Sequence, residues 1–145
     1  MSDKTHVNVN FFEPQDVDER DWGKEILLGL LPGVASMKML VLKAGKKGGL
    51  QKHHLKNEIG YLHSGKMIVR FDTGNGKIQE RIILPGECIH FPPGAVHQEE
   101  AVEDCVIFEL STPHFNDRVR MEETYGMEIS EGGLPSTTID EVETR

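Results

Sequence analysis

The chain has 145 residues and a mass of 16.3 kDa, which fits one domain with a core of its own. Acidic residues outnumber basic ones by 24 to 16, so the formal net charge is −8 at pH 7. This balance argues against non-specific binding to nucleic acid or to an anionic membrane. The sequence has no apolar run near the ~18 residues of a membrane span and no signal-like start, so we expect a cytoplasmic protein.

Short alternating or apolar runs follow one another along the chain, separated by turn residues such as Gly48-Gly49 and Pro85-Gly86. Glycine and proline at such points supply the backbone angles that chain reversals need. The runs predict strands at 7–11, 24–31, 36–44, 58–63, 66–72, 77–84, 87–91, 96–102 and 104–110. Because no long segment with a helical period interrupts them, we predict an all-β sandwich or barrel.

The sequence changes character after Pro113, where polar and charged residues become frequent. We therefore expect a single domain over residues 1–125 and a tail over 126–145. Within the tail, Thr138 followed by Glu141 fits a capping box and predicts a short terminal helix.

The two cysteines, Cys88 and Cys105, lie in apolar runs and lack the C-x-x-C spacing of redox or metal motifs. We expect both to be buried, reduced thiols. Near the N-terminus, Val7, Val9 and Phe11 form an apolar face on the first predicted strand. Such a strand could extend the sheet of a second copy, so we expect a homodimer.

A pattern for metal binding occurs in the second half of the chain, where residues 86–97 read G-x5-P-x-G-x2-H and end at His97. Upstream, the segment 51–58 contains His53, His54 and Glu58. Neutral imidazoles together with a carboxylate are the ligands that divalent transition metals prefer. Strand alternation allows Glu58 and His97 to point inward in the same barrel. These residues therefore predict a metal site.

At these two segments the sequence resembles the cupin superfamily, whose motifs are G-x5-H-x-H-x3–4-E-x6-G and G-x5-P-x-G-x2-H-x3-N. The second motif matches except at its last position, where Ala101 replaces asparagine. The resemblance implies a double-stranded β-helix, also called a jelly-roll barrel, followed here by the short C-terminal tail. It also implies one divalent transition metal ion, for which Zn, Mn, Fe, Co and Ni are all open.

The first motif leaves two alternatives for its histidine ligands. Four residues between histidine and Glu58 make His53 a ligand and put Gln51 in the first histidine position. Three residues make His54 the ligand and put Lys52 there. We prefer the first alternative, because a glutamine oxygen can ligate a metal, whereas a lysine must first lose its proton. The expected metal ligands are the following: Gln51, His53, Glu58 and His97.

A narrower resemblance is to the C-terminal cupin domain of the type II mannose-6-phosphate isomerases. It rests on Trp22-Gly23, on residues 50–54, on residues 56–58 and on the segment 117–126, which resembles D-x-V-R-x-E-D-x-Y-G. Lys56 stands where those enzymes tend to carry arginine. The resemblance implies an enzyme of carbohydrate metabolism that isomerises a sugar phosphate or a related activated sugar.

Residues 43–56 contain five lysines and no acid, which indicates either a solvated loop or a rim that attracts an anionic substrate. With the isomerase resemblance, the anion-binding residues would be Lys52, Lys56 and Arg120, although Arg120 could instead tie the tail down by pairing with acids. The catalytic residues would be His54, as a base, and Lys56. Two other functions stay open, an Fe(II) dioxygenase and a non-catalytic cupin that binds a metal or small molecule.

Overall fold

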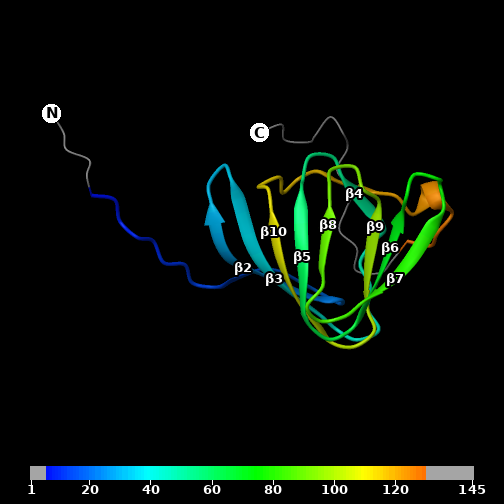
Figure 1. Ribbon diagram of the computed structural model, residues 1–145, viewed down its shortest axis with the longest axis horizontal. Coiled ribbons are helices and arrows are strands. Elements are labelled where there is room, and N and C mark those ends of the chain that lie inside the picture. The colour runs from blue at the N-terminus through cyan, green and yellow to red at the C-terminus, as the bar shows by residue number, and fades with distance from the viewer. Residues whose placement is uncertain (1–5, 130–145) are drawn as a thin grey trace.

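The computed structural model describes residues 6–129, which form eleven strands and one short 3-10 helix (Figure 1). The strands are β1 (Gln15–Arg20), β2 (Gly23–Leu31), β3 (Ala35–Leu42), β4 (Gln51–His53), β5 (Glu58–Ser64), β6 (Met67–Asp72), β7 (Ile78–Ile83), β8 (Cys88–Phe91), β9 (His97–Ala101), β10 (Cys105–Ser111) and β11 (Arg118–Arg120). The 3-10 helix spans Glu123–Tyr125. The all-β prediction is confirmed. Within the described residues, no helix is long and apolar enough to cross a membrane.

The strands form two antiparallel sheets that pack against each other as a jelly-roll barrel. The larger sheet has the order β1-β2-β3-β10-β5-β8, and the smaller one has the order β11-β4-β9-β6-β7. Strands distant in sequence are neighbours, for example β3 and β10, which pair from Ser36 with Ser111 to Leu42 with Cys105. The sheets lie on opposite sides of the interior in Figure 1.

Eight of the predicted strands form close to their expected positions. The predicted strand at 7–11 is wrong. That segment has no strand assignment and extends away from the barrel in Figure 1, because no neighbouring strand of the same chain pairs with it. Three strands were not expected: β1, and the three-residue strands β4 and β11.

Strand alternation in β5 follows the pattern that the sequence predicts. Glu58, Gly60 and Leu62 are buried, whereas the intervening residues are exposed. Successive side chains of a strand point to opposite faces of the sheet, so Glu58 and Leu62 share the inner face. One strand therefore contributes both a carboxylate and a core residue to the interior.

The apolar core lies between the two sheets. Leu62 and Ile107 contribute from the larger sheet, and Met67, Val69 and Ala101 contribute from the smaller one. All are almost completely buried, and burying a large aliphatic side chain stabilises a fold by ~1.5–3 kcal/mol.

The cysteines differ from the expectation in one respect. Both lie in the described part of the chain and both are free thiols, but only Cys105 is buried, whereas Cys88 is exposed. Cys88 is the first residue of β8, an edge strand of the larger sheet, and faces outward there. The helix expected at Thr138 lies outside the described residues.

Candidate metal centre

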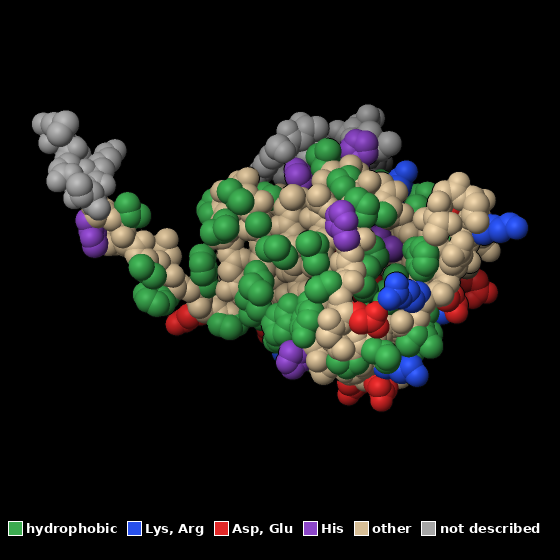
Figure 2. Space-filling view, viewed as in Figure 1, with side chains coloured by type: hydrophobic (Ala, Val, Ile, Leu, Met, Phe, Trp, Pro, Cys, Tyr) green, Lys and Arg blue, Asp and Glu red, His purple; other side chains and the backbone are tan. Residues whose placement is uncertain are grey.

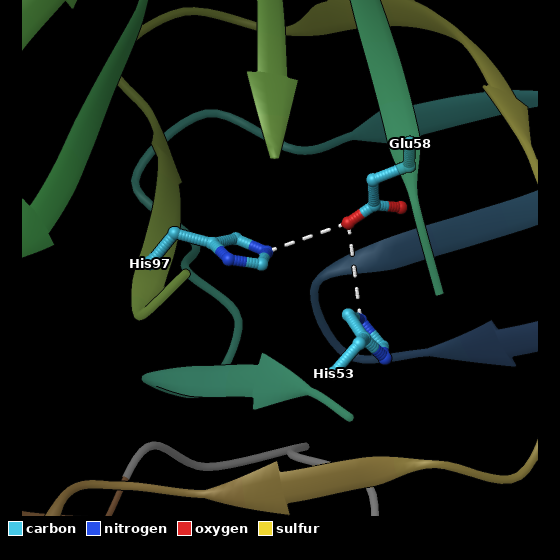
Figure 3. A group of neighbouring side chains, drawn as sticks. All are labelled: His53, Glu58 and His97. Atoms are coloured by element: carbon cyan, nitrogen blue, oxygen red, sulfur yellow. Dashed lines mark ion pairs between the residues drawn. The ribbon is translucent and has the colours of Figure 1, made fainter. Parts of the chain in front are cut away.

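Three buried side chains converge in the interior: His53 at the end of β4, Glu58 at the start of β5 and His97 at the start of β9 (Figure 3). One ligand atom from each lies within 4.8 Å of the others. The Glu58 Oε1 atom is 3.5 Å from His97 Nε2 and 3.8 Å from His53 Nε2. Two imidazoles and a carboxylate at these distances can hold a divalent transition metal.

A tight turn joins the two parts of the site. The backbone N–H of Ala95 donates to the Pro92 carbonyl at 3.1 Å, and Gly94 has a φ of 86°, as in a type II turn with proline at its second position. The Gly94 N–H also donates to the carbonyl of His53 at 2.7 Å. The P-x-G motif therefore holds the chain that leads to His97 against the end of β4.

His97 is oriented by two contacts. Its Nδ1 donates to the Ala95 carbonyl at 3.0 Å, so its Nε2 is the nitrogen with a free lone pair. The Phe91 ring stacks on the imidazole at a centroid distance of 3.9 Å. Burial lowers the pKa of His97 to about 4, which keeps the imidazole neutral at pH 7. The Nε2 atom is buried and has no hydrogen-bond partner.

His53 is oriented by Asp117, which accepts a hydrogen bond from its Nδ1 at 2.9 Å. Burial lowers the pKa of His53, although Asp117 acts in the opposite direction. Asp117 also accepts the backbone N–H groups of Leu55 and Lys56 at 2.8 Å and 2.6 Å. Burial would raise the pKa of Asp117, but these hydrogen bonds lower it to about 2. A carboxylate bound to the far nitrogen of a histidine is the usual support of a metal ligand.

Glu58 shares a cation with Glu109. Lys56 Nζ lies 2.9 Å from both Glu58 Oε2 and Glu109 Oε1. Burial raises the pKa of Glu58 to about 7, whereas Lys56 outweighs the same effect at Glu109 and lowers its pKa to about 2. Burial would lower the pKa of Lys56, but the two carboxylates raise it. Lys56 alone does not keep Glu58 ionised, so a second cation, such as a bound metal ion, would favour its charged form.

The structure distinguishes between the two alternatives for the ligands of the first motif. Gln51 pairs with His97 across the strands and lies two residues before His53, so all three share the inner face. Lys52 lies between them in β4 and points to the other face. His54 follows the strand and is exposed. The structure thus brings His53, and not His54, together with Glu58 and His97.

The residues expected to bind an anion lie in other surroundings. Lys56 is only 9% exposed and is held by the two carboxylates. Arg120 donates to both carboxylate oxygens of Glu122, with a shortest distance of 2.7 Å, which is the pairing with acids considered above. In the 43–56 segment, Lys46 also forms an ion pair, with Asp21 at 2.8 Å.

A cavity lies beside the triad, between β2 and β3 of the larger sheet and β4, β9 and β11 of the smaller one. It is lined by Trp22, Glu25, Leu40, Leu42, Gly48, Gly49, Gln51, Glu99 and Arg118. Burial raises the pKa of Glu99 to about 8, and the nearby Glu58 and Glu109 add to the effect.

Sequence reasoning missed Asp117, Glu99 and Arg118 as site residues. Asp117 had a signal, as the first residue of the 117–126 resemblance. Glu99 could have been found from strand alternation, because it lies two residues after His97 on the same face.

The donor set fits a transition metal. Each histidine has its Nδ1 engaged and turns its Nε2 toward Glu58. A buried nitrogen without a partner, such as His97 Nε2, is costly unless it binds something. His53, Glu58 and His97 would hold the metal, and Gln51 is the further donor on the same face.

Comparisons with known proteins agree with the fold. No protein-family model matches the chain. An oxalate decarboxylase of Arthroderma benhamiae is 31% identical over 84 residues, which are 57% of this chain and 20% of that protein. The capsular polysaccharide assembling protein CapF of Staphylococcus aureus is 25% identical, with a TM-score of 0.65 over 75% of this chain and 32% of that one. The chain thus spans about a fifth to a third of these relatives.

An RmlC-like cupin of Shewanella frigidimarina is closer in size. It has a TM-score of 0.59 at 16% identity, and the match covers 74% of this chain and 94% of that one. At this identity the likeness concerns the fold alone. These likenesses do not show the narrower resemblance to the mannose-6-phosphate isomerases. The jelly-roll fold, the His-Glu-His site and these likenesses together support the resemblance to the cupin superfamily.

Proposed function

We propose that the protein is a metal-dependent enzyme that isomerises a small anionic sugar. Sugar phosphates and activated sugars are the class that the sequence resemblance implies. The observation that carries the proposal is the cavity, which holds charged side chains of both signs and is lined by the cross-strand neighbours of two metal ligands, Gln51 opposite His97 and Arg118 opposite His53. A concave site with a few convergent polar groups is the usual form of a small-molecule site.

A metal bound by His53, Glu58 and His97 would polarise the oxygens on the two carbons between which the proton moves. The protein supplies the rest of the chemistry. Asp117 keeps the imidazole of His53 in one orientation, and Phe91 does the same for His97. Trp22, Leu40 and Leu42 wall the cavity with apolar surface, which limits the access of water.

Two side chains can serve as the base of this reaction. A base must reach the proton that it removes, within hydrogen-bond distance of the bound substrate. Glu99 lines the cavity, whereas His54 is exposed at the end of β4. We favour Glu99 over His54 for this reason, and Glu99→Gln should reduce kcat more than His54→Ala does.

The test is an isomerase assay with metal-loaded protein and a panel of anionic aldoses that includes mannose 6-phosphate and glucuronate. We expect a ketose to form from at least one of them with wild-type protein and not with His97→Ala. His63→Ala is the matched control, because His63 is exposed on the outer face of β5. Failure of every sugar substrate to react would refute the isomerase.

The oxalate decarboxylase relative favours a second candidate, a metal-dependent reaction on a small carboxylic acid. The same ligands would hold Fe(II) or Mn(II) in this case. Release of carbon dioxide from oxalate, or consumption of oxygen, would support this candidate over the isomerase.

We also propose that the protein forms a homodimer. Figure 2 shows apolar side chains gathered over the outer face of β3, β10 and β5, where Met37, Leu110 and Ile59 are direct cross-strand neighbours and all are exposed. The extended segment 6–14 adds Phe11, which is 91% exposed. Sedimentation at micromolar concentration should give the mass of a dimer, and a monomer mass would contradict it.

A further inference from the structure

Arg118 is a cation in the interior that lacks an anion. Its Nε atom is buried and has no hydrogen-bond partner. No carboxylate forms an ion pair with its guanidinium anywhere in residues 6–129. Burial lowers the pKa of Arg118, but an arginine keeps its charge at any physiological pH. Buried polar groups are normally satisfied, so this arginine stands out.

The position of Arg118 connects it to the metal centre. In the β11–β4 pair it lies directly opposite His53, so the two side chains share the inner face. Arg118 also lines the cavity, together with Gln51 and Glu99. Gln51 in turn pairs with His97. A molecule in the cavity would therefore contact the guanidinium while its other end lies near the metal ligands.

Two other cations that lie near the metal centre in the described part of the chain, Lys56 and Arg120, are already paired. Lys56 is shared by Glu58 and Glu109, and Arg120 binds Glu122. Glu25, which lines the cavity, lies 3.5 Å from Lys38. Arg118 is the cation of the cavity whose charge is available to a ligand.

We propose that Arg118 binds a single carboxylate of the substrate, and that the substrate is a hydroxy acid such as a sugar acid. The planar guanidinium fork matches a carboxylate with two parallel hydrogen bonds. A dianionic phosphate would bring two charges into a cavity that has this one free cation and also contains Glu25 and Glu99. Those carboxyl groups and the Gln51 amide suit the hydroxyl groups of the substrate. The inference rests on the proposed function and specifies its anionic group.

The binding test uses three ligands with the same ring that differ at carbon 6: glucuronate, glucose and glucose 6-phosphate. Calorimetry with metal-loaded protein should show that wild type binds glucuronate most tightly. Arg118→Met should weaken glucuronate binding by about tenfold to a hundredfold and leave glucose binding unchanged. Arg118→Lys should retain part of the affinity, because it keeps the charge but loses the fork. The control is Arg81→Met, since Arg81 is exposed and paired with Glu87.

A second measurement needs no ligand. An unpaired buried charge costs stability, so Arg118→Met should raise the thermal unfolding midpoint of the metal-loaded protein by a few degrees. An arginine with a structural role would instead lower it. A lowered midpoint overturns the proposal, as does glucuronate binding in Arg118→Met equal to that of wild type.

The two proposals fail in different ways. A preference of wild type for glucose 6-phosphate over glucuronate overturns the carboxylate inference and leaves the sugar-phosphate enzyme intact. Turnover that persists in His97→Ala would refute the metal-dependent function. It would not affect the anion site at Arg118, which the glucuronate binding measurements test separately.

Discussion

The interior between the two sheets has a polar half and an apolar half, and three strands, β5, β9 and β10, contribute to both. We define the polar half by His97, Glu99, Glu58, Glu109 and His53, and the apolar half by Leu62, Met67, Val69, Ala101 and Ile107. Along β9 the inner face changes from His97 through Glu99 to Ala101. In the β10–β5 pair, Ile107 lies opposite Leu62 and Glu109 lies opposite Gly60. The change from apolar to polar residues therefore occurs at the same position along both strands.

The comparison shows how a small barrel separates stability from function. The apolar half gains free energy by excluding water from aliphatic surface. In the polar half, burial disfavours the charged forms of Glu58, Glu99 and His97 and shifts their pKa values toward the neutral forms, whereas Lys56 keeps Glu109 ionised. Removing residues from the two halves should therefore affect different measurements.

The largest expected effect is at His97. His97→Ala removes the donor whose Nε2 is buried without a partner, so the purified protein should lose stoichiometric metal, with affinity reduced more than ~100-fold. Elemental analysis measures this directly. His63→Ala should keep its metal, and full metal content in His97→Ala would refute the site.

In the apolar half, the corresponding change is Leu62→Ala. Leu62 is 1% exposed, so the cavity left behind should lower the free energy of unfolding by ~2–5 kcal/mol. Chemical denaturation of metal-free protein measures the loss. Metal stoichiometry of the folded protein should not change, and a loss of metal here would mean that the two halves are not separable. Ile59→Ala, on the outer face of the same strand, should cost less than ~1 kcal/mol.

Glu99 offers a test through pH. Its pKa is about 8 in the fold, against 4.5 for the ordinary group, so the unfolded chain releases this proton at lower pH than the folded one. The stability that depends on the protonated form is present below pH 4.5 and is lost as the pH rises toward 8. Glu99→Gln does not titrate, so its stability relative to wild type should increase over that range by about 1–4 kcal/mol. Equal pH profiles of metal-free wild type and variant would contradict the raised pKa of Glu99.

Asp117 is not one of the expected metal ligands, but it orients the ligand His53. Asp117→Asn keeps the shape and one oxygen, but weakens the hydrogen bond that orients His53, so metal affinity should fall by about 10–100-fold. Competition with a chelator measures the affinity. Asp104→Asn is a matched control at an exposed aspartate that accepts a hydrogen bond from the Ala44 N–H. A similar loss of affinity in both variants would argue against an orienting role for Asp117.

The sequence predicted the parts of this arrangement that leave a local pattern. Alternation in β5 and the P-x-G-x2-H spacing are such patterns, and they located Glu58 and His97. Contacts between distant segments leave none. Asp117 lies 64 positions from His53, and Glu109 lies 53 positions from Lys56, so the buried surroundings of Lys56 could not be read from its neighbours. The strand β11 has only three residues, too few to show a period, and Arg118 was therefore missed.

The smallest expected effect concerns the first position of the upstream motif, where Gln51 and Lys52 were alternatives. Gln51 shares the inner face of β4 with His53 and pairs with His97, whereas Lys52 points to the other face. Gln51→His should therefore place a third imidazole toward Glu58 and strengthen metal binding by up to about tenfold, because imidazole is a better ligand than an amide for borderline metals. Lys52→His should leave the affinity unchanged, and calorimetric titration of metal into both variants makes the comparison. If Lys52→His binds the metal more tightly and Gln51→His does not, the polar half is built from the opposite face of β4, and the choice between the two residues must be reversed.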